Sequence, residues 1–248
     1  LRGKTIQAEV ELYSTVASGN TVIQKHRFLL KCDGLPFYKG DTVFGYFTDE
    51  ALENQTGLDG GKAKLPWLDE NTSHDMKVYR LNDSNSRLES GKPHLKLAGN
   101  QLNLLDEVHL SPSVGSHGKG YAYGKRIVDP KDWFFPCHFH QDPVMPGSLG
   151  VEAILQALQV FCLDQKLGDS FSNPRFRPSL SQTHWKYRGQ IIPTTGMMQL
   201  ELHVSKIEKR DEQLMLVADA SLWRDELRIY EVQNLSLIHI SEPTRPLR

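Results

Sequence analysis

The most constraining feature of the sequence is an apolar run, Val151–Leu163, which is interrupted only by Glu152, Gln156 and Gln159. The three polar residues are four and three positions apart, so on a helix they share one face while the other faces are hydrophobic. A helix that is apolar around most of its circumference lies inside a domain. The run therefore predicts a buried helix over about residues 149–163, too short and too often interrupted to span a membrane.

A turn rich in proline and glycine precedes this helix and carries chemically useful groups. His138 lies just ahead of the turn, and an unperturbed histidine titrates near neutral pH. A buried Glu152 would have a raised pKa and could donate a proton, with Gln156 one turn further on to orient its carboxyl group. Gly147 offers an unobstructed amide at the helix N-terminus, where developing negative charge is stabilised. Spacing alone equally allows Glu152 to be a structural charge in the first helical turn.

The histidines and cysteines near the turn, together with the net charge of the chain, argue against several classes of function. Cys137, His138 and His140 lie close together, but C-H-x-H is not a recognised ligand spacing, and we expect no metal site. The three cysteines of the chain show no CxxC pair, which fits a reducing, cytoplasmic location. The formal charge of −1 argues against a nucleic-acid binder.

Residues 133–159, WFFPCHFHQDPVMPGSLGVEAILQALQ, resemble the active-site signature of the bacterial 3-hydroxydecanoyl-ACP dehydratase family. They resemble in particular the dehydratase domains of polyunsaturated-fatty-acid synthase multienzymes. Residues 185–193, WKYRGQIIP, resemble the next strand of the same family. The resemblance implies an α+β hot-dog fold, in which an antiparallel sheet wraps a long buried helix, as part of a double hot-dog.

The resemblance also implies a reaction and roles for individual residues. The reaction is dehydration of a (3R)-3-hydroxyacyl thioester, carried on the phosphopantetheine of an acyl carrier protein, to a trans-2-enoyl thioester without a cofactor. His138 would be the catalytic histidine, Glu152 the acid, and Gly147 the amide that polarises the thioester carbonyl. Relatives that also isomerise the double bond have Asp at the acidic position, so the Glu here favours dehydration and leaves isomerisation open. The expected substrate-binding residues are Gln156, Phe139, Val144 and Pro146.

A second hot-dog module is also implied, because in hot-dog dehydratases the histidine and the acid commonly come from opposite modules. It would be supplied in cis or by a homodimer, and the other expected partners are carrier-protein domains, with no nucleic acid and no membrane. Two alternative functions remain open at this point. One is a hot-dog thioesterase, which need not keep a histidine ahead of a Pro-Gly turn. The other is a non-catalytic module that binds acyl chains or scaffolds a multienzyme.

The first 45 residues repeat near the end of the chain at an offset of 192 positions. Strand-like stretches coincide at this offset, and each copy is typical of two or three antiparallel strands joined by hairpins. In the first copy the expected turns are residues 17–20 and Asp33-Gly34. Matching pairs include Gln7 with Gln199, Glu9 with Glu201, Asp33 with Asp225, Leu35 with Leu227, and Tyr38 with Tyr230.

The repeat predicts four regions. Residues 1–48 would be the C-terminal half of a preceding, truncated hot-dog module, and residues 49–100 a connection with a short helix near residues 49–54. Residues 101–234 would be a complete dehydratase module. From about residue 235 the sequence LSLIHISEPTR resembles translated sequencing-adapter read-through. We therefore expect residues 235–248 to be a non-native tail without structural weight.

Overall fold

The computed structural model describes residues 3–71, 74–82, 88, 92–178, 182–210 and 213–240. The chain divides into two compact units, residues 1–55 and 56–248, which are described separately below. No helix within the described residues is long and apolar enough to cross a membrane.

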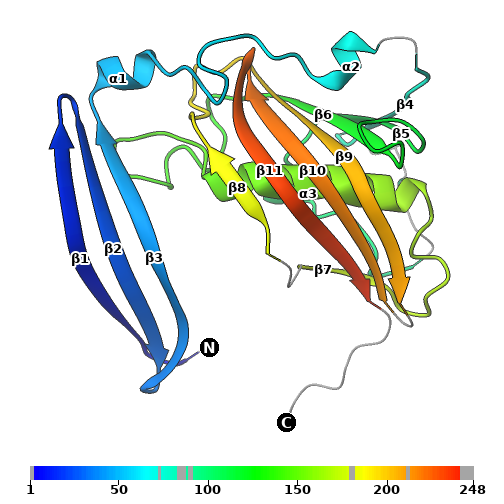
Figure 1. Cartoon of the computed structure of the whole chain (residues 1–248). Coiled ribbons are helices and arrows are strands. Elements are labelled where there is room, and N and C mark those ends of the chain that lie inside the picture. Colours follow the sequence, from blue (N-terminus) through cyan, green and yellow to red (C-terminus); the bar gives the residue numbers. More distant parts are fainter. Residues whose placement is uncertain are drawn as a thin grey trace. The chain divides into compact units, whose positions relative to one another are not determined.

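The second unit is built around one long helix, α3, Gly147–Asp164. It is wrapped by an antiparallel sheet with the strand order β4-β5-β6-β9-β10-β11-β7, and β8 also pairs with β11. Helix α3 packs against β5, β6, β9, β10 and β11, and Figure 1 shows it crossing the sheet. This is the α+β hot-dog arrangement that the family resemblance implies. The strands are β4 Lys77–Arg80, β5 Glu107–Ser111, β6 Tyr121–Ile127, β7 Arg175–Pro178, β8 His184–Tyr187, β9 Met197–Arg210, β10 Gln213–Arg224 and β11 Leu227–Ile240.

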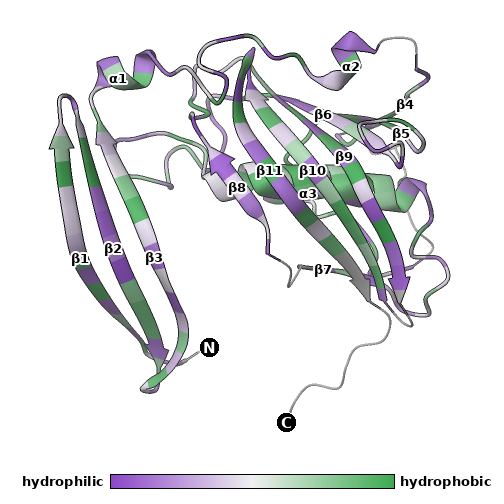
Figure 2. Cartoon of the chain, in the orientation of Figure 1, coloured by the Kyte–Doolittle hydropathy of each residue, from purple (hydrophilic) through white to green (hydrophobic). Residues whose placement is uncertain are grey.

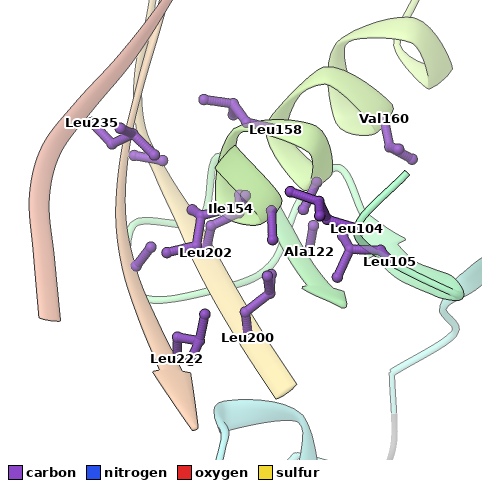
Figure 3. Packing of buried hydrophobic residues seen from close by; sticks show 14 of the residues in the cluster. Leu104, Leu105, Ala122, Ile154, Leu158, Val160, Leu200, Leu202, Leu222 and Leu235 are labelled. Carbon is purple, nitrogen blue, oxygen red and sulfur yellow. The ribbon is translucent and has the colours of Figure 1, made fainter. Parts of the chain in front are cut away.

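The core of this unit lies between α3 and the sheet. Ile154 and Leu158 of α3 have no exposed surface, and neither do Leu200, Leu202 and Leu222 of the facing strands. Figure 3 shows these leucines around the helix. Burial of apolar surface on every side of α3 explains why its sequence is hydrophobic almost throughout, since each buried side chain of this kind contributes about 1.5–3 kcal/mol.

The first unit is a three-stranded meander followed by a short helix. Strands β1 (Ile6–Ser18), β2 (Thr21–Cys32) and β3 (Leu35–Phe47) pair antiparallel in that order. The two hairpin turns lie where the sequence predicts them, and in the second Asp33 and Gly34 have φ of 50° and 80°. Such left-handed values are tolerated by Asp and Gly, which explains the residues found there. The expected short helix is α1, Asp49–Glu53, whose N-cap is Thr48.

The structure confirms the repeat in the bounds of the strands and in the register of their pairing. Strand β10 lies 192 positions after β2 at both ends, and β11 begins 192 positions after β3. The β1/β2 pairing skips Tyr13, and the β9/β10 pairing skips Ser205, the corresponding residue. A second irregularity, after Leu30, recurs after Leu222. Two copies of one strand unit therefore fold alike.

The correspondence between β3 and β11 ends at Asn234, which has φ of 57° and lies at a bulge that β3 lacks. This is where the predicted tail begins. The expectation that nothing beyond residue 235 has structural weight is nevertheless wrong for residues 235–240. They extend β11 and pair with β10 and β7, and Leu235 and Leu237 are buried. Residues 241–248 lie outside the described residues.

The segment between the two strand units contributes more than a connection. It contains α2 (Trp67–Glu70), the edge strand β4 and the 3-10 helix η1 (Asn100–Leu102). The part before α2 crosses the outer face of the sheet, where Asp59 forms an ion pair with the Arg228 side chain. Further along, the Trp67 amide donates to Glu201 at 2.6 Å. These part-buried polar contacts fix the segment to the second unit.

Candidate active site

A tight turn places the His138 ring against the backbone of the segment that leads into α3. Phe139 and Asp142 form an isolated bridge, and Gln141 between them has φ of 59°. This left-handed residue reverses the chain within a few positions. As a result, Nδ1 of His138 lies 3.0 Å from the carbonyl oxygen of Val144.

This contact fixes the tautomer of His138. A carbonyl oxygen only accepts hydrogen bonds, so Nδ1 must carry the proton and donate it. Nε2 of the neutral ring then keeps its lone pair and can act as a base. The ring also stacks on Phe139, with centroids 3.9 Å apart and planes 30° apart. The ring is therefore held by one hydrogen bond and one stacking contact.

Helix α3 begins at Gly147, after Pro146 as its N-cap residue, and no side chain caps it. The amides of its first turn are thus not occupied by a capping side chain, which leaves donors at the positive end of the helix dipole. A Cβ at Gly147 would lie 2.9 Å from the Trp185 ring and 3.2 Å from the Tyr187 ring. Glycine at this position therefore has a packing cause as well as the amide access that the sequence suggests.

Glu152 lies in the second turn of α3 and is partly buried. Desolvation by burial raises the pKa of its carboxyl group, because the charged form loses contact with water. The raised pKa favours the protonated form, which can donate a proton. Among the described contacts, His138 and Glu152 share no hydrogen bond; the hydrogen bond of the His138 ring goes to the Val144 carbonyl.

Gln156 is buried and is used in a different way from the one that the helix pattern suggests. Its Oε1 accepts from the Leu104 amide at 3.0 Å, and its Nε2 donates to the Leu102 carbonyl at 3.3 Å and to Asn103 at 3.4 Å. The amide group therefore ties α3 to residues 102–104, at the end of η1. These bonds go to the 102–104 segment, and none goes to the Glu152 carboxyl.

We expect Gln156→Leu to destabilise the second unit by about 1–3 kcal/mol, because the buried Leu104 amide loses its acceptor. Thermal unfolding of the variant measures this, with Gln159→Leu, one turn further on at a partly exposed position, as the matched control. A fall in substrate turnover without any change in unfolding would instead support the substrate-binding role predicted from the sequence.

The structure places the other predicted residues around the same turn. Phe139 is 51% exposed, whereas the Val144 side chain is buried and its carbonyl oxygen holds His138. Cys137 and His140 are both exposed, and the Cys137 thiol donates to the Trp133 carbonyl at 3.2 Å. Within the described residues, no group of three or more potential ligands could hold a metal ion.

Three aromatic residues near the start of α3 were not predicted from the sequence to be functional residues. Trp185 and Tyr187 lie on β8, and Tyr230 lies opposite Tyr187 on β11. The Trp185 and Tyr187 rings stack with centroids 5.5 Å apart, and the Tyr187 and Tyr230 rings meet edge to face at 4.9 Å. The sequence held one feature that could have drawn attention to Tyr230, namely its match with Tyr38 in the repeat.

Comparison with known proteins identifies the second unit. Residues 97–233 match the family model described as a FabA-like domain. The chain is 36% identical over 245 residues to one of the polyunsaturated fatty acid synthase subunits of Thraustochytrium sp.. That match covers 94% of this chain but only 16% of the relative, so the chain spans about a sixth of that protein.

Solved structures give more distant likenesses. The CurJ dehydratase matches with a TM-score of 0.47 and 13% identity, over 92% of this chain and 66% of that one. The dehydratase heterocomplex ApeI:P from Xenorhabdus doucetiae matches with a TM-score of 0.40 and 10% identity, over 59% of this chain and 88% of that one. The assignment rests on the family match and the curated relative: the chain belongs to the FabA-like domain family.

Proposed function

We propose that this chain dehydrates (3R)-3-hydroxyacyl thioesters on an acyl carrier protein to trans-2-enoyl thioesters during fatty acid synthesis. The observation that supports this most strongly is the hydrogen bond from His138 Nδ1 to the Val144 carbonyl, which leaves Nε2 as a base. The FabA-like family match and the likeness to a component of a polyunsaturated fatty acid synthase support the same reaction class.

In the proposed reaction, His138 Nε2 removes a proton from C2 of the substrate. The electron pair of the C2–H bond forms the C2=C3 double bond, and the C3–O bond breaks. Protonated Glu152 gives its proton to the departing hydroxyl, so that water leaves. The Gly147 amide donates to the thioester oxygen as negative charge develops there, an effect typically worth about 10²–10³ in rate.

The proposal is tested by offering one 3-hydroxyacyl group on an acyl carrier protein and on free pantetheine. We expect an enoyl product from both thioesters and a higher kcat/KM for the carrier-bound one, because the carrier adds binding contacts. Equal kcat/KM values for the two thioesters would contradict recognition of the carrier protein by this chain. The position of the double bond in the product shows whether the chain also isomerises it. A product that contains only the trans-2 double bond indicates dehydration without isomerisation.

We propose further that residues 1–48 are the strand half of a second hot-dog module. Positions that face α3 in the second unit are solvent-exposed apolar residues in the first. Leu202 is fully buried, but its counterpart Val10 is 64% exposed, and Tyr230 is 1% exposed where Tyr38 is 59% exposed. Figure 2 shows hydrophobic residues interspersed along β1, β2 and β3. A sheet with such a face is completed by a helix equivalent to α3.

Amide hydrogen exchange measures whether this face is covered. We expect fast exchange in β1–β3 of this chain and slow exchange in β9–β11, because a three-stranded sheet without a packed layer is only marginally stable. Adding the sequence that precedes residue 1 in a full-length relative should slow exchange in β1–β3. Equal protection of both strand sets in this chain would contradict the proposal.

A further inference from the structure

Tyr230 holds the backbone of Gly147 through a direct hydrogen bond. Its hydroxyl donates to the Gly147 carbonyl oxygen at 3.1 Å, and only 1% of the residue is exposed. The Tyr187 ring meets the Tyr230 ring edge to face, with centroids 4.9 Å apart. The Tyr230 hydroxyl therefore links strand β11 to the first residue of α3.

Aromatic rings also enclose the start of the helix sterically. A Cβ at Gly150 would lie 2.4 Å from the Tyr230 ring, so the ring occupies the space that any side chain there would take. The Gly147 Cα faces the Trp185 and Tyr187 rings in the same manner. The first turn of α3 is thus confined on two sides by side chains from β8 and β11.

This confinement answers a difficulty in the proposed chemistry. An amide that stabilises developing charge must be oriented before the reaction, because reorientation costs free energy at the transition state. Glycine is the residue with the greatest backbone freedom. The close approach of the rings requires glycine at position 147, and the same rings together with the Tyr230 hydroxyl restrict its motion.

We infer that Tyr230 is a positioning residue: by holding the Gly147 carbonyl it fixes the backbone of the first helical residue, and so steadies the Gly147 amide for the thioester oxygen, an inference that rests on the proposed dehydration. Burial raises the pKa of the Tyr230 hydroxyl well above its usual range, so the phenol remains a donor at working pH.

The test is Tyr230→Phe, which removes the hydroxyl and keeps the ring. We expect kcat to fall about tenfold to a hundredfold with KM unchanged, because the misplaced amide affects the transition state more than substrate binding. The NMR order parameter of the Gly147 amide should fall from about 0.85 toward 0.6. Tyr123→Phe is the matched control, since its buried hydroxyl bonds Gln199 at 2.6 Å, away from α3.

Unchanged kcat and an unchanged Gly147 order parameter in Tyr230→Phe would overturn the inference. A loss of equal size in Tyr123→Phe would overturn it too, because any buried phenol would then have the same effect. If the unchanged chain forms no enoyl product, the proposed function fails, and the order parameter still decides whether Tyr230 orients the amide. Tyr187→Phe should give a smaller loss, because the Tyr230 bond to Gly147 persists.

Discussion

Replacement of His138 by alanine is expected to lower the rate of enoyl thioester formation by about 10²–10⁴-fold, the contribution of a positioned general base. The physical reason is the hydrogen bond from Nδ1 to the Val144 carbonyl, which leaves Nε2 as the proton acceptor. The rate is followed by the ultraviolet absorbance of the conjugated enoyl thioester.

His140→Ala is the matched control for this prediction. His140 lies two positions away, is exposed, and belongs to the same turn. We expect this variant to keep turnover near that of the unchanged chain. A similar loss in both variants would mean that the turn itself, and not the His138 ring, supports the reaction.

Glu152→Gln is expected to reduce turnover by a similar factor, about 10²–10⁴, because glutamine cannot supply the proton that the departing hydroxyl needs. The loss is the same whether His138 and Glu152 meet within one module or across an interface between two copies of it. The double variant with His138→Ala should be little worse than either single one, since residues that act as a unit give non-additive losses. Fully additive losses would show that the two groups act independently.

The same substitution should not destabilise the fold at neutral pH. Burial raises the folded-state pKa of Glu152, so ionisation favours the unfolded chain once the pH exceeds the ordinary glutamate value of about 4.3. This cost is complete above the raised folded-state pKa and absent when both states are protonated. Glu152→Gln removes it, so we expect Tm to rise or stay level at pH 7 and the gain to vanish near pH 4.

The stability comparison also has a matched control. Glu226→Gln removes a carboxyl group from an exposed residue in the β10–β11 turn, and its effect on Tm should be small at both pH values. A clear drop in Tm for Glu152→Gln at pH 7 would contradict the desolvation argument, because it would indicate that the carboxylate makes a stabilising contact.

Much of the fold could be predicted from local sequence. The apolar run of α3 is stable only inside a core, so the run itself marks the helix. The predicted bounds, 149–163, lie within about two residues of the observed ones. The 192-residue repeat predicted the paired strand units because each copy carries its own turn residues, such as Asp33 and Asp225 with their left-handed backbones. The candidate site could be proposed from the sequence because His138, Gly147 and Glu152 lie close together in the chain.

The remainder depended on contacts between distant segments. Gln156 shares a helix face with Glu152, but its partners are backbone groups of residues 102–104, which the helix pattern cannot reveal. Tyr230 reaches Gly147 only because β8 and β11 pair beside the helix N-terminus. The end of β11 differs from the prediction because residues 235–240 continue the strand by pairing with β10 and β7, whatever their origin.

The most direct measurement is the mass of the acyl group after a 3-hydroxyacyl carrier-protein thioester is incubated with the chain. We expect the acyl group to lose the mass of one water while it stays attached to the carrier. Release of a free 3-hydroxy acid, as a thioesterase would give, or an unchanged acyl mass would contradict the assignment of His138 and Glu152 to dehydration.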